Sequence, residues 1–413
     1  MISLTEAQRY VLDSLTPLAP EVLPLGQALG CVAVGDTYAI EAVPGFTNSS
    51  MDGFALRSAD THDGVAQLRV LGSVLAGDGP ALQLGVGDAA RIMTGAPLPD
   101  GADSVCMLEE VSFDSANQTV TIERKILAGE YVRHPGEDVE IGQLLVSSGD
   151  VLHATRLAVL ASQGVTSVLA IRQLRVGVLS TGNELARATG PLQSGQIRDL
   201  NRPLLLSLLH ESGCTAVDLG IVSDNHAHIT QRLRDASSDC DAVISTGGVS
   251  VGDVDHVKLV IGELGGESAR WMQVAIKPGK PFAFGVVGDR RVPLFGLPGN
   301  PVSTRVSFEL FVRPALRRLA GYHRLERLIL NAVLECPLPR TRDGKLHLVH
   351  AVARVHEDGL VHVERIIRHG SHLLSAIVEA NVLVMVPDGD SPSKGDVARV
   401  MVLDADELSG VTR

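Results

Sequence analysis

Four short stretches of the chain combine glycine with side chains that can do chemistry, and each follows an apolar run typical of a buried strand. They are 180–184 (STGNE), 245–253 (STGGVSVGD), 277–281 (KPGKP) and 298–301 (PGNP). Glycines let backbone N–H groups approach phosphate oxygens, while Lys277 and Lys280 supply positive charge. Because ligands bind beyond the carboxyl ends of strands in open α/β sheets, we expect these stretches to line one pocket for an anion.

Acidic side chains occur in or near the same stretches: Glu184, Asp224, Asp253 and Asp255. An anion alone does not favour carboxylates, whereas a divalent cation placed between carboxylates and a phosphate does. The combination predicts metal-assisted chemistry on a phosphorylated ligand. Each residue also has a structural alternative, since Asp224 and Asp253 could cap the helices that follow them and the lysines could be solvated.

The stretch 295–311 (FGLPGNPVSTRVSFELF) ends an apolar run and begins a helical pattern at once. Asn300 is a favoured N-cap residue, and Pro301 suits the first helical position, which needs no N–H. Free amides at a helix start can bind an anion, although for the stretch taken alone a tight turn is the favoured interpretation. The chain has neither a Walker A sequence nor a strand leading into Gly-x-Gly-x-x-Gly, which disfavours an ordinary nucleotidase or dehydrogenase.

The elements that must position these residues alternate between strand and helix from 174 to 320, which is typical of a doubly wound α/β domain with a mainly parallel sheet. Within it we expect a helix at 201–213 with Asn201 as its cap. Residues 43–138 and the tail from 325 contain short strand-like runs separated by turn residues. These patterns predict a β-rich domain and a small barrel or sandwich.

The predicted fold is therefore multidomain α/β plus β: a doubly wound domain, a discontinuous helical domain, a β-rich domain and a C-terminal β-barrel. The expected boundaries are 1–42 with 139–172 for the discontinuous domain, 43–138 for the β-rich domain, 173–324 for the α/β domain and 325–413 for the barrel. Ser3 and Glu6 predict a capping box at the start of the first helix.

Composition excludes several classes of protein. The 413 residues carry a net charge of −12, which disfavours a broad nucleic-acid or anionic-membrane surface. No apolar window is long enough for a membrane span, and the five cysteines form no C-x-x-C, so we expect a cytoplasmic protein without disulfides. Histidines recur between 347 and 372; they could ligate a metal, but solvated strand histidines are the simpler expectation.

Eight motifs occur in order along nearly the whole chain: MDGFA, IMTGAP, GED, STGNE, GGVSVGD, IKPGKPFAFG, GLPGNPVS and GSH. Together they closely resemble the molybdopterin molybdenumtransferase family, known as MoeA in bacteria and as the C-terminal domain of gephyrin in animals. The resemblance implies four domains and a homodimer whose active cleft is formed by both subunits. It also implies the last step of molybdenum cofactor synthesis, in which molybdate is inserted into molybdopterin-AMP and AMP is released with Mg²⁺ assisting.

The resemblance assigns roles to residues of this chain. It implies metal ligands at Asp224, Asp255 and Glu184, and catalytic roles at these residues and at Asp52, Thr94, Lys277 and Lys280. It implies substrate-binding positions at Arg133, Asp138, Gly247, Gly248, Ser250, Pro298, Asn300, Pro301, Ser303, His350 and Ser371. Lysines, hydroxyls and a helix start suit molybdate, because it is a tetrahedral dianion. Transient contacts with the adenylyltransferase and with molybdoenzymes are implied as well.

The chain departs from the family's pattern at two positions. Asn183 stands where the family usually has an aspartate, and His350 stands where an arginine is usual in the last domain. A histidine is a weaker anion partner than an arginine, so His350→Arg is predicted to tighten molybdate binding. A non-catalytic scaffold paralogue is the alternative to an enzyme, whereas an adenylyltransferase is disfavoured because it normally lacks the β-rich and last domains.

Overall fold

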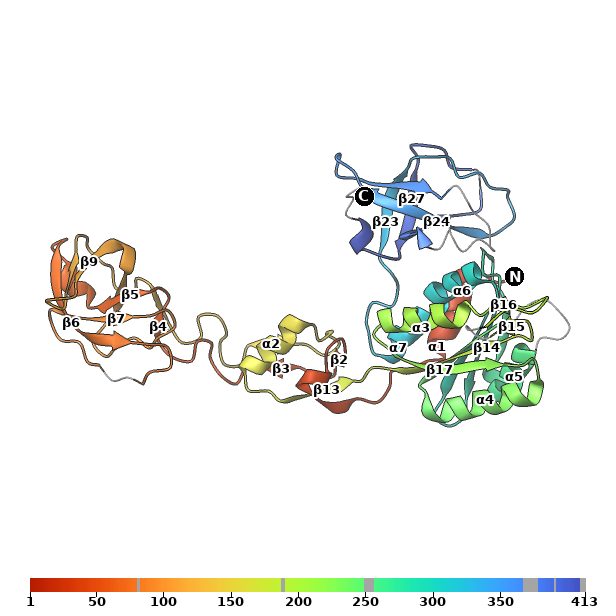
Figure 1. Cartoon of the computed structure of the whole chain (residues 1–413), viewed down its shortest axis with the longest axis horizontal. Helices are drawn as coiled ribbons and strands as arrows, with labels where there is room; N and C mark the ends of the chain where they lie inside the picture. Colours follow the sequence, from red (N-terminus) through yellow and green to blue (C-terminus); the bar gives the residue numbers. More distant parts are fainter. Residues whose placement is uncertain (80–81, 187–189, 249–255, 367–377, 390, 409–413) are drawn as a thin grey trace. The chain divides into compact units, whose positions relative to one another are not determined.

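The computed structural model describes residues 1–79, 82–186, 190–248, 256–366, 378–389 and 391–408. Its contacts divide the chain into two compact units (Figure 1). Unit 1 comprises Met1–Val34, Gly149–His153 and Ser167–Arg413, and unit 2 comprises Gly35–Ser148 and Ala154–Thr166. Among the described helices, none is both long and apolar enough to span a membrane.

Unit 2 is built on a six-stranded sheet in the order β8 (Ser104–Met107), β5 (Gly53–Leu56), β7 (Asp88–Ile92), β6 (Ala66–Val74), β10 (Thr119–Ile122) and β9 (Val111–Asp114). Strand β5 is buried at every position, because one apolar cluster forms around Phe54 and another around Ala55. The remaining elements are β3 (Thr37–Tyr38) with β12 (Leu144–Val146), β4 (Asn48–Ser49) with β11 (Val132–Arg133), α2 (Ala154–Ser162), and the 3₁₀ turns η2 (Ser58–Thr61) and η3 (Leu108–Glu110).

Unit 1 begins with helix α1 (Leu4–Asp13). The Ser3 hydroxyl accepts the Glu6 N–H at 3.2 Å, so the predicted helix start is confirmed. The buried side chains Ala7 and Val11 join the core of the α/β sheet. A small antiparallel sheet follows, in the order β1 (Glu21–Pro24), β13 (Ser167–Ile171) and β2 (Val32–Ala33), with the 3₁₀ turn η1 (Leu25–Gln27) between β1 and β2.

The main sheet of unit 1 has the order β17 (Thr215–Val222), β14 (Arg175–Thr181), β18 (Ala242–Thr246), β22 (Val292–Leu297), β21 (Pro281–Val287) and β19 (Arg270–Gln273). Its first four strands run parallel, and β21 runs antiparallel to β22. One hydrophobic core cluster joins the sheet to α1, α3 (Asn201–Glu211), α6 (Pro301–Ser307), the π-helical η5 (Phe308–Val312) and α7 (Arg313–Leu319). A second hydrophobic cluster joins the sheet to α4 (His226–Asp239) and α5 (His256–Gly265). Helices therefore cover both faces, and the predicted doubly wound α/β domain is confirmed. The short strands β15 (Leu185–Ala186) and β16 (Ile197–Arg198) and the 3₁₀ turn η4 (Gly266–Ser268) complete it.

The predicted cap of α3 differs from the structure, and so does the capping role that Asp224 had as an alternative to metal binding. Asn201 is the first residue of α3 rather than its cap, because Leu200 occupies the cap position. Likewise the cap of α4 is Asn225, whose side chain accepts the His228 N–H at 3.1 Å, and not Asp224. Both Asn201 and Asp224 are thereby left for interactions outside their helices.

The predicted start of α6 is confirmed. The Asn300 side chain accepts the Val302 N–H at 3.1 Å, and Pro301 is the first helical residue.

The C-terminal part of unit 1 is a closed barrel of five strands, as predicted. Its order is β24 (Leu346–Val355), β25 (Val361–Arg365), β23 (Ile329–Leu334), β27 (Val397–Val402) and β26 (Val382–Val386), and β26 pairs with β24 to close the ring. The 3₁₀ turn η6 (Asp406–Leu408) follows β27. Strand β20 (Ile276–Lys277) follows β19 in the chain but does not join the α/β sheet; it pairs in parallel with β24. This pairing ties the lysine-containing loop to the barrel.

Candidate functional site

Three neighbouring parallel strands, β14, β18 and β22, end side by side at the carboxyl edge of the α/β sheet. Their loops and the segment before α3 surround a pocket of about 310 Å³. It is lined by Ser180, Thr181, Glu184, Leu185, Ile197, Arg198, Asp199, Leu200, Asn201, Thr246, Gly247, Gly299, Asn300 and Pro301. The pocket therefore brings together three of the four glycine-rich stretches.

Glycine is required where the loop after β18 passes the end of β14. Gly247 has φ +94°, and a Cβ there would lie 2.4 Å from the Thr181 carbonyl oxygen. Gly248 has φ +63°, and a Cβ there would lie 2.9 Å from Val257 Cγ2. Neither conformation nor space admits a side chain, so the backbone itself forms this wall of the pocket.

Asn201 joins the loops after β18 and β22. Its Nδ2 donates to Thr246 Oγ1 and to the Gly299 carbonyl oxygen, both at 2.7 Å. Asn201 Oδ1 and Thr181 Oγ1 are buried, and neither atom has a partner among the described residues. Since buried polar atoms are costly when unpaired, these two atoms are available to a bound ligand.

The first turn of α6 holds the Pro-Gly-Asn-Pro loop in place. Thr304 Oγ1 donates to the carbonyl oxygens of Pro298 and Asn300, at 2.6 and 3.0 Å. The next loop in space also contacts this helix: a Cβ at Gly279, which has φ +93°, would lie 3.1 Å from Ser307 Oγ and 3.6 Å from the Ser303 carbonyl oxygen. The lysine loop therefore packs against α6.

Lys277 and Lys280 are held by backbone interactions on both sides of Gly279. The Lys280 carbonyl oxygen accepts the Val274 N–H at 2.8 Å, and Lys277 lies opposite His347 in the β20–β24 pair. Lys277 is exposed and Lys280 is half-buried. Within the described ranges, neither ammonium group pairs with a carboxylate, so their charge is available to an anion.

The acidic residues gather at the other end of this edge. The Asn183 N–H donates to Asp224 Oδ2 at 3.1 Å, and the Asp224 N–H donates to Asn183 Oδ1 at 3.2 Å. The Glu184 carboxylate folds back over Gly182, where a Cβ would lie 2.7 Å from both of its oxygens. Glu184 and Asp224, both exposed, thus follow the adjacent strands β14 and β17.

The acidic and basic groups are too far apart to hold one small ion together. Strands β14 and β21 are separated by three strand spacings in the sheet order, or roughly 14 Å at about 4.8 Å a spacing. The pocket beside Asn201 lies between them. This edge therefore suits an extended ligand with an anionic group at the lysine end and a phosphate–metal group at the acidic end.

Other predicted residues of unit 1 differ in their accessibility. Ser303 is 8% exposed, and His350 is 7% exposed with its Nε2 lacking a partner among the described residues. Burial, with the Arg305 charge adding to it, lowers the pKa of His350 to about 4. Ser250, Asp255 and Ser371 lie outside the described residues.

Sequence reasoning missed several pocket residues, among them Arg198, Asp199 and Asn201. The Asp199 carboxylate accepts the Ser180 hydroxyl at 3.0 Å and pairs with Arg202 Nε at 2.9 Å, so it links the end of β14 to α3. The sequence does contain a signal for these residues: the polar run 197–202 (IRDLNR) comes directly before an apolar helical pattern.

The predicted residues of the β-rich region form a second group within unit 2. The Thr94 N–H and hydroxyl both donate to Asp52 Oδ1 at 2.7 Å, and these bonds lower the pKa of Asp52. Arg133 lies opposite Asn48 in the β4–β11 pair. The four predicted residues of this unit, Asp52, Thr94, Arg133 and Asp138, are all exposed. Asp138 donates its N–H to the Val43 carbonyl oxygen at 3.0 Å and does not join the Asp52–Thr94 contact.

Comparison with known proteins identifies the class of each part of the chain. Residues 177–318 match the profile of the probable molybdopterin binding domain. Residues 2–164 match the MoeA N-terminal region (domain I and II), and residues 331–403 match the MoeA C-terminal region (domain IV). The α/β domain thus belongs to the class of the probable molybdopterin binding domain.

Comparisons over the whole chain assign all three matched regions to one family. The molybdopterin molybdenumtransferase of Haemophilus influenzae is 36% identical over 387 residues, 94% of each chain. Molybdopterin molybdenumtransferase 2 of Mycobacterium tuberculosis is 35% identical over 399 residues, 94% of this chain and 96% of that protein. A molybdopterin biosynthesis MoeA protein from Pyrococcus horikoshii superposes with a TM-score of 0.79 at 31% identity, covering 98% of this chain and 100% of that one. This chain belongs to the MoeA family, as its motifs predict.

Proposed function

We propose that this chain inserts molybdenum into molybdopterin-AMP and releases AMP, as the last step of molybdenum cofactor biosynthesis. Relatives 33–36% identical over at least 90% of this chain are named molybdopterin molybdenumtransferase. The observation that carries the proposal is the loop with Lys277 and Lys280, packed on α6 at the same sheet edge as a pocket and two exposed carboxylates.

Molybdate would bind at the lysine end of this edge. It is a dianion, and Lys277 and Lys280 offer ammonium groups without a carboxylate partner in the described parts of the chain. Ser303 lies in the helix on which this loop packs. The molybdopterin-AMP would extend along the pocket, where Thr181 can donate a hydrogen bond and Asn201 Oδ1 can accept one.

The acidic end of the edge suits Mg²⁺, because this ion prefers carboxylate oxygens and keeps several waters. Asp224 and Glu184 carry such oxygens on neighbouring loops, and we propose Asp255 as a third ligand. Mg²⁺ bound there would neutralise phosphate charge during hydrolysis. Asn183 keeps the two loops joined through Asp224 with one negative charge fewer than an aspartate would bring.

In the hydrolysis, the oxygen of a water molecule forms a bond to phosphorus while the phosphoanhydride P–O bond breaks, which yields AMP. The protein's part is to hold the two ends of the ligand and the anion in place, since positioning and charge stabilisation supply most of the catalysis in phosphoryl transfer.

The test supplies molybdopterin-AMP, molybdate and Mg²⁺ to the purified chain and measures AMP by chromatography. We expect AMP release that requires molybdate and falls at least tenfold in Lys277→Ala, because one of two anion-binding charges is lost. Lys125→Ala, which removes an exposed lysine of unit 2, is the matched control and is expected to keep full activity. Binding of molybdopterin-AMP without any AMP release would instead support a non-catalytic scaffold.

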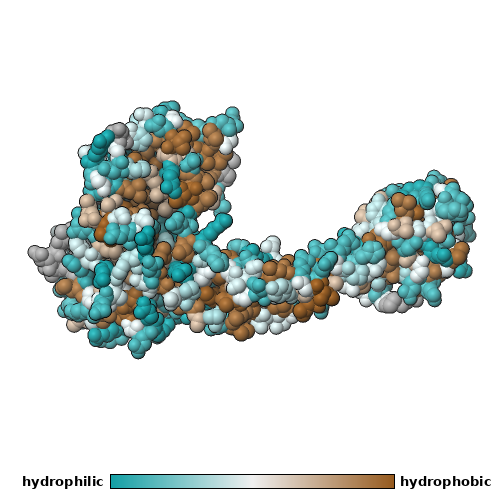
Figure 2. All heavy atoms as spheres, turned by 180° about the vertical axis from the view of Figure 1, so that it is seen from behind, coloured by the Kyte–Doolittle hydropathy of each residue, from teal (hydrophilic) through white to brown (hydrophobic). Residues whose placement is uncertain are grey.

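We also propose that the chain works as a homodimer, with unit 2 of one subunit completing the site of the other. Exposed large apolar side chains in each unit support association: Val22 and Leu29 of unit 1 are 68% and 54% exposed, and Ile40 and Ile141 of unit 2 are 67% and 71% exposed. Figure 2 shows apolar patches of this kind among the polar surface of the chain. Asp52 and Thr94 are both exposed, so this hydrogen-bonded pair is accessible to a ligand.

A further inference from the structure

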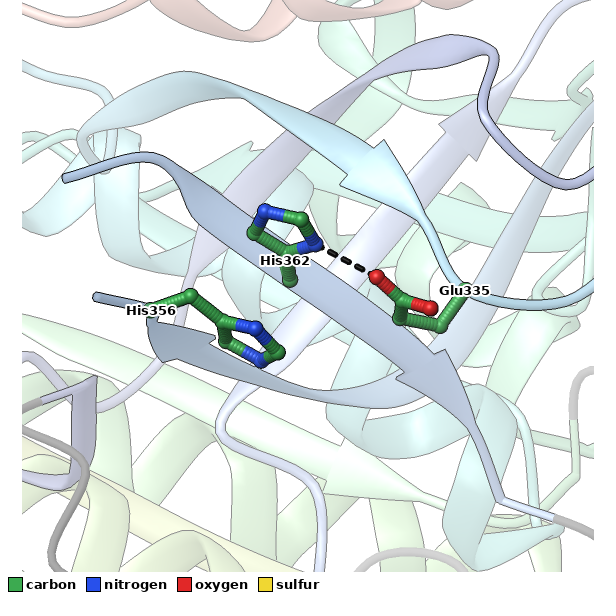
Figure 3. A group of neighbouring side chains, drawn as sticks. All are labelled: Glu335, His356 and His362. Atoms are coloured by element: carbon green, nitrogen blue, oxygen red, sulfur yellow. Dashed lines mark hydrogen bonds and ion pairs between the residues drawn. The ribbon is translucent and has the colours of Figure 1, made fainter. Parts of the chain in front are cut away.

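A second group of potential metal ligands lies on the barrel, outside the site described above (Figure 3). Glu335 follows β23, His362 lies in β25, and His356 lies in the hairpin between β24 and β25. Strands β23 and β25 are parallel with Val333 opposite His362, and the Glu335 N–H donates to the Val363 carbonyl oxygen at 3.0 Å. The barrel thus brings these three side chains together from different segments.

The geometry of the three side chains suits a single ion. One ligand atom from each lies within 4.8 Å of the others. His362 Nδ1 is 2.5 Å from Glu335 Oε1, and the rings of His356 and His362 stack with centroids 4.0 Å apart and planes 13° from parallel. Two ligands of a tetrahedral zinc ion lie roughly 3.4 Å apart, given bonds of about 2.0–2.2 Å. Because an imidazole nitrogen binds a metal in the plane of its ring, the stacked His356 ring has to rotate before its nitrogen and that of His362 face one ion. That ion would replace the contact between His362 and Glu335.

Two further residues support these ligands. Asp358 Oδ2 lies 2.9 Å from His362 Nε2, and Lys394 Nζ lies 3.1 Å from Glu335 Oε2. A metal-bound histidine usually gives its second ring N–H to a carboxylate, which fixes the ring's orientation. Asp358 is already in that position, so that Nδ1 of His362 is the nitrogen left for a metal.

We propose that Glu335, His356 and His362 bind one divalent ion of the late first transition series, Zn²⁺ being the best match, with Asp358 as a positioning residue. Two imidazole nitrogens and one carboxylate suit such ions, whereas Mg²⁺ and Ca²⁺ prefer oxygen ligands alone. The ion would link the end of β23 to the β24–β25 hairpin and so stabilise the barrel. The site would act separately from molybdenum insertion.

The test is zinc titration by calorimetry of the metal-stripped full chain, with excess Mg²⁺ present to occupy sites made of oxygen ligands. We expect one more zinc ion bound to the wild-type chain than to His356→Ala; His356 is exposed, so its loss leaves the barrel core intact. His62→Ala is the control, because His62 also pairs with a carboxylate, Asp63, at 3.0 Å, yet lies outside the cluster. Equal zinc binding by the wild type and His356→Ala would overturn the proposal.

Two measurements separate ligation from general surface binding. Zinc is expected to raise the melting temperature of the wild type but not of His356→Ala, because it binds the folded barrel. Asp358→Asn is expected to keep the stoichiometry and to weaken the affinity by about 10-fold to 100-fold. An unchanged zinc affinity in Asp358→Asn would refute the positioning role of Asp358. A melting temperature of the wild type that does not change with zinc would refute the proposed link across the barrel.

Discussion

At the scale of single residues, burial decides what His350 can do. It is 7% exposed beside Arg305, and its pKa is lowered to about 4, first by burial and then by the Arg305 charge. The imidazole is therefore neutral at physiological pH and offers no positive charge to molybdate. An arginine at this position would place a second guanidinium next to Arg305 in a buried setting, so the structure favours a loss of stability in His350→Arg over the tighter molybdate binding that the sequence predicts.

The same residue makes stability depend on pH. Below its ordinary pKa of 6.5, His350 binds a proton in the unfolded chain, whereas in the folded chain it does so only near its lowered pKa of about 4. The stabilisation that His350 contributes to the folded state is therefore fully present above pH 6.5 and is lost as the pH falls toward 4. Between pH 7 and pH 5 the free energy of unfolding is expected to fall by about 2 kcal/mol more in the wild type than in His350→Gln. Urea unfolding at the two pH values measures this, and parallel pH profiles would contradict it.

At the scale of elements, the site depends on bonds between the ends of strands. Asn201 at the start of α3 connects the loops after β18 and β22, while β20 is held by pairing with β24 of the barrel. The loops after β18 and β22 and the lysine loop are therefore each placed by an element distant in sequence. A loop that lost these bonds would still carry the same residues but would no longer hold them in place. Catalysis at such sites depends strongly on the positions of these residues.

Asn201→Ala tests this connection. It removes two hydrogen bonds and leaves the buried Thr246 hydroxyl and Gly299 carbonyl without their shared donor. We expect a loss of about 1–3 kcal/mol in the free energy of unfolding and a weaker affinity for molybdopterin-AMP, measured by urea unfolding and calorimetry. Asn331→Ala, which changes an exposed asparagine of β23, is the control. If Asn201→Ala bound molybdopterin-AMP with wild-type affinity, the hydrogen bonds of Asn201 would not be needed to position the two loops.

At the scale of the whole molecule, the predicted catalytic residues divide between two compact units. Lys277, Lys280, Glu184 and Asp224 belong to unit 1, and Asp52 and Thr94 belong to unit 2. The proposed homodimer, in which each site would take its parts from two subunits, would bring these two groups of residues together.

Mixing two impaired variants tests the proposed shared site. In a mixture of Asp52→Ala and Lys277→Ala chains, subunit exchange would create dimers with one site that carries neither substitution. We expect AMP release to recover to about a quarter of the wild-type rate, since half of the dimers are mixed and each has one intact site. The rate of molybdate-dependent AMP release, with each variant alone as control, measures this. No recovery after proven subunit exchange would place both residues in the same subunit's site.

The strand–helix alternation and the cap and proline of α6 can be predicted from the amino-acid sequence, because they rest on local backbone preferences and on burial patterns along the chain. The family can be predicted from eight ordered motifs. Four features required the folded chain: Asn201 joins two loops, the lysine loop is held by the barrel, His350 is buried beside Arg305, and Glu335 lies close to His356 and His362. Desolvation and pairing between distant residues set these features, and neither leaves a local pattern in the sequence.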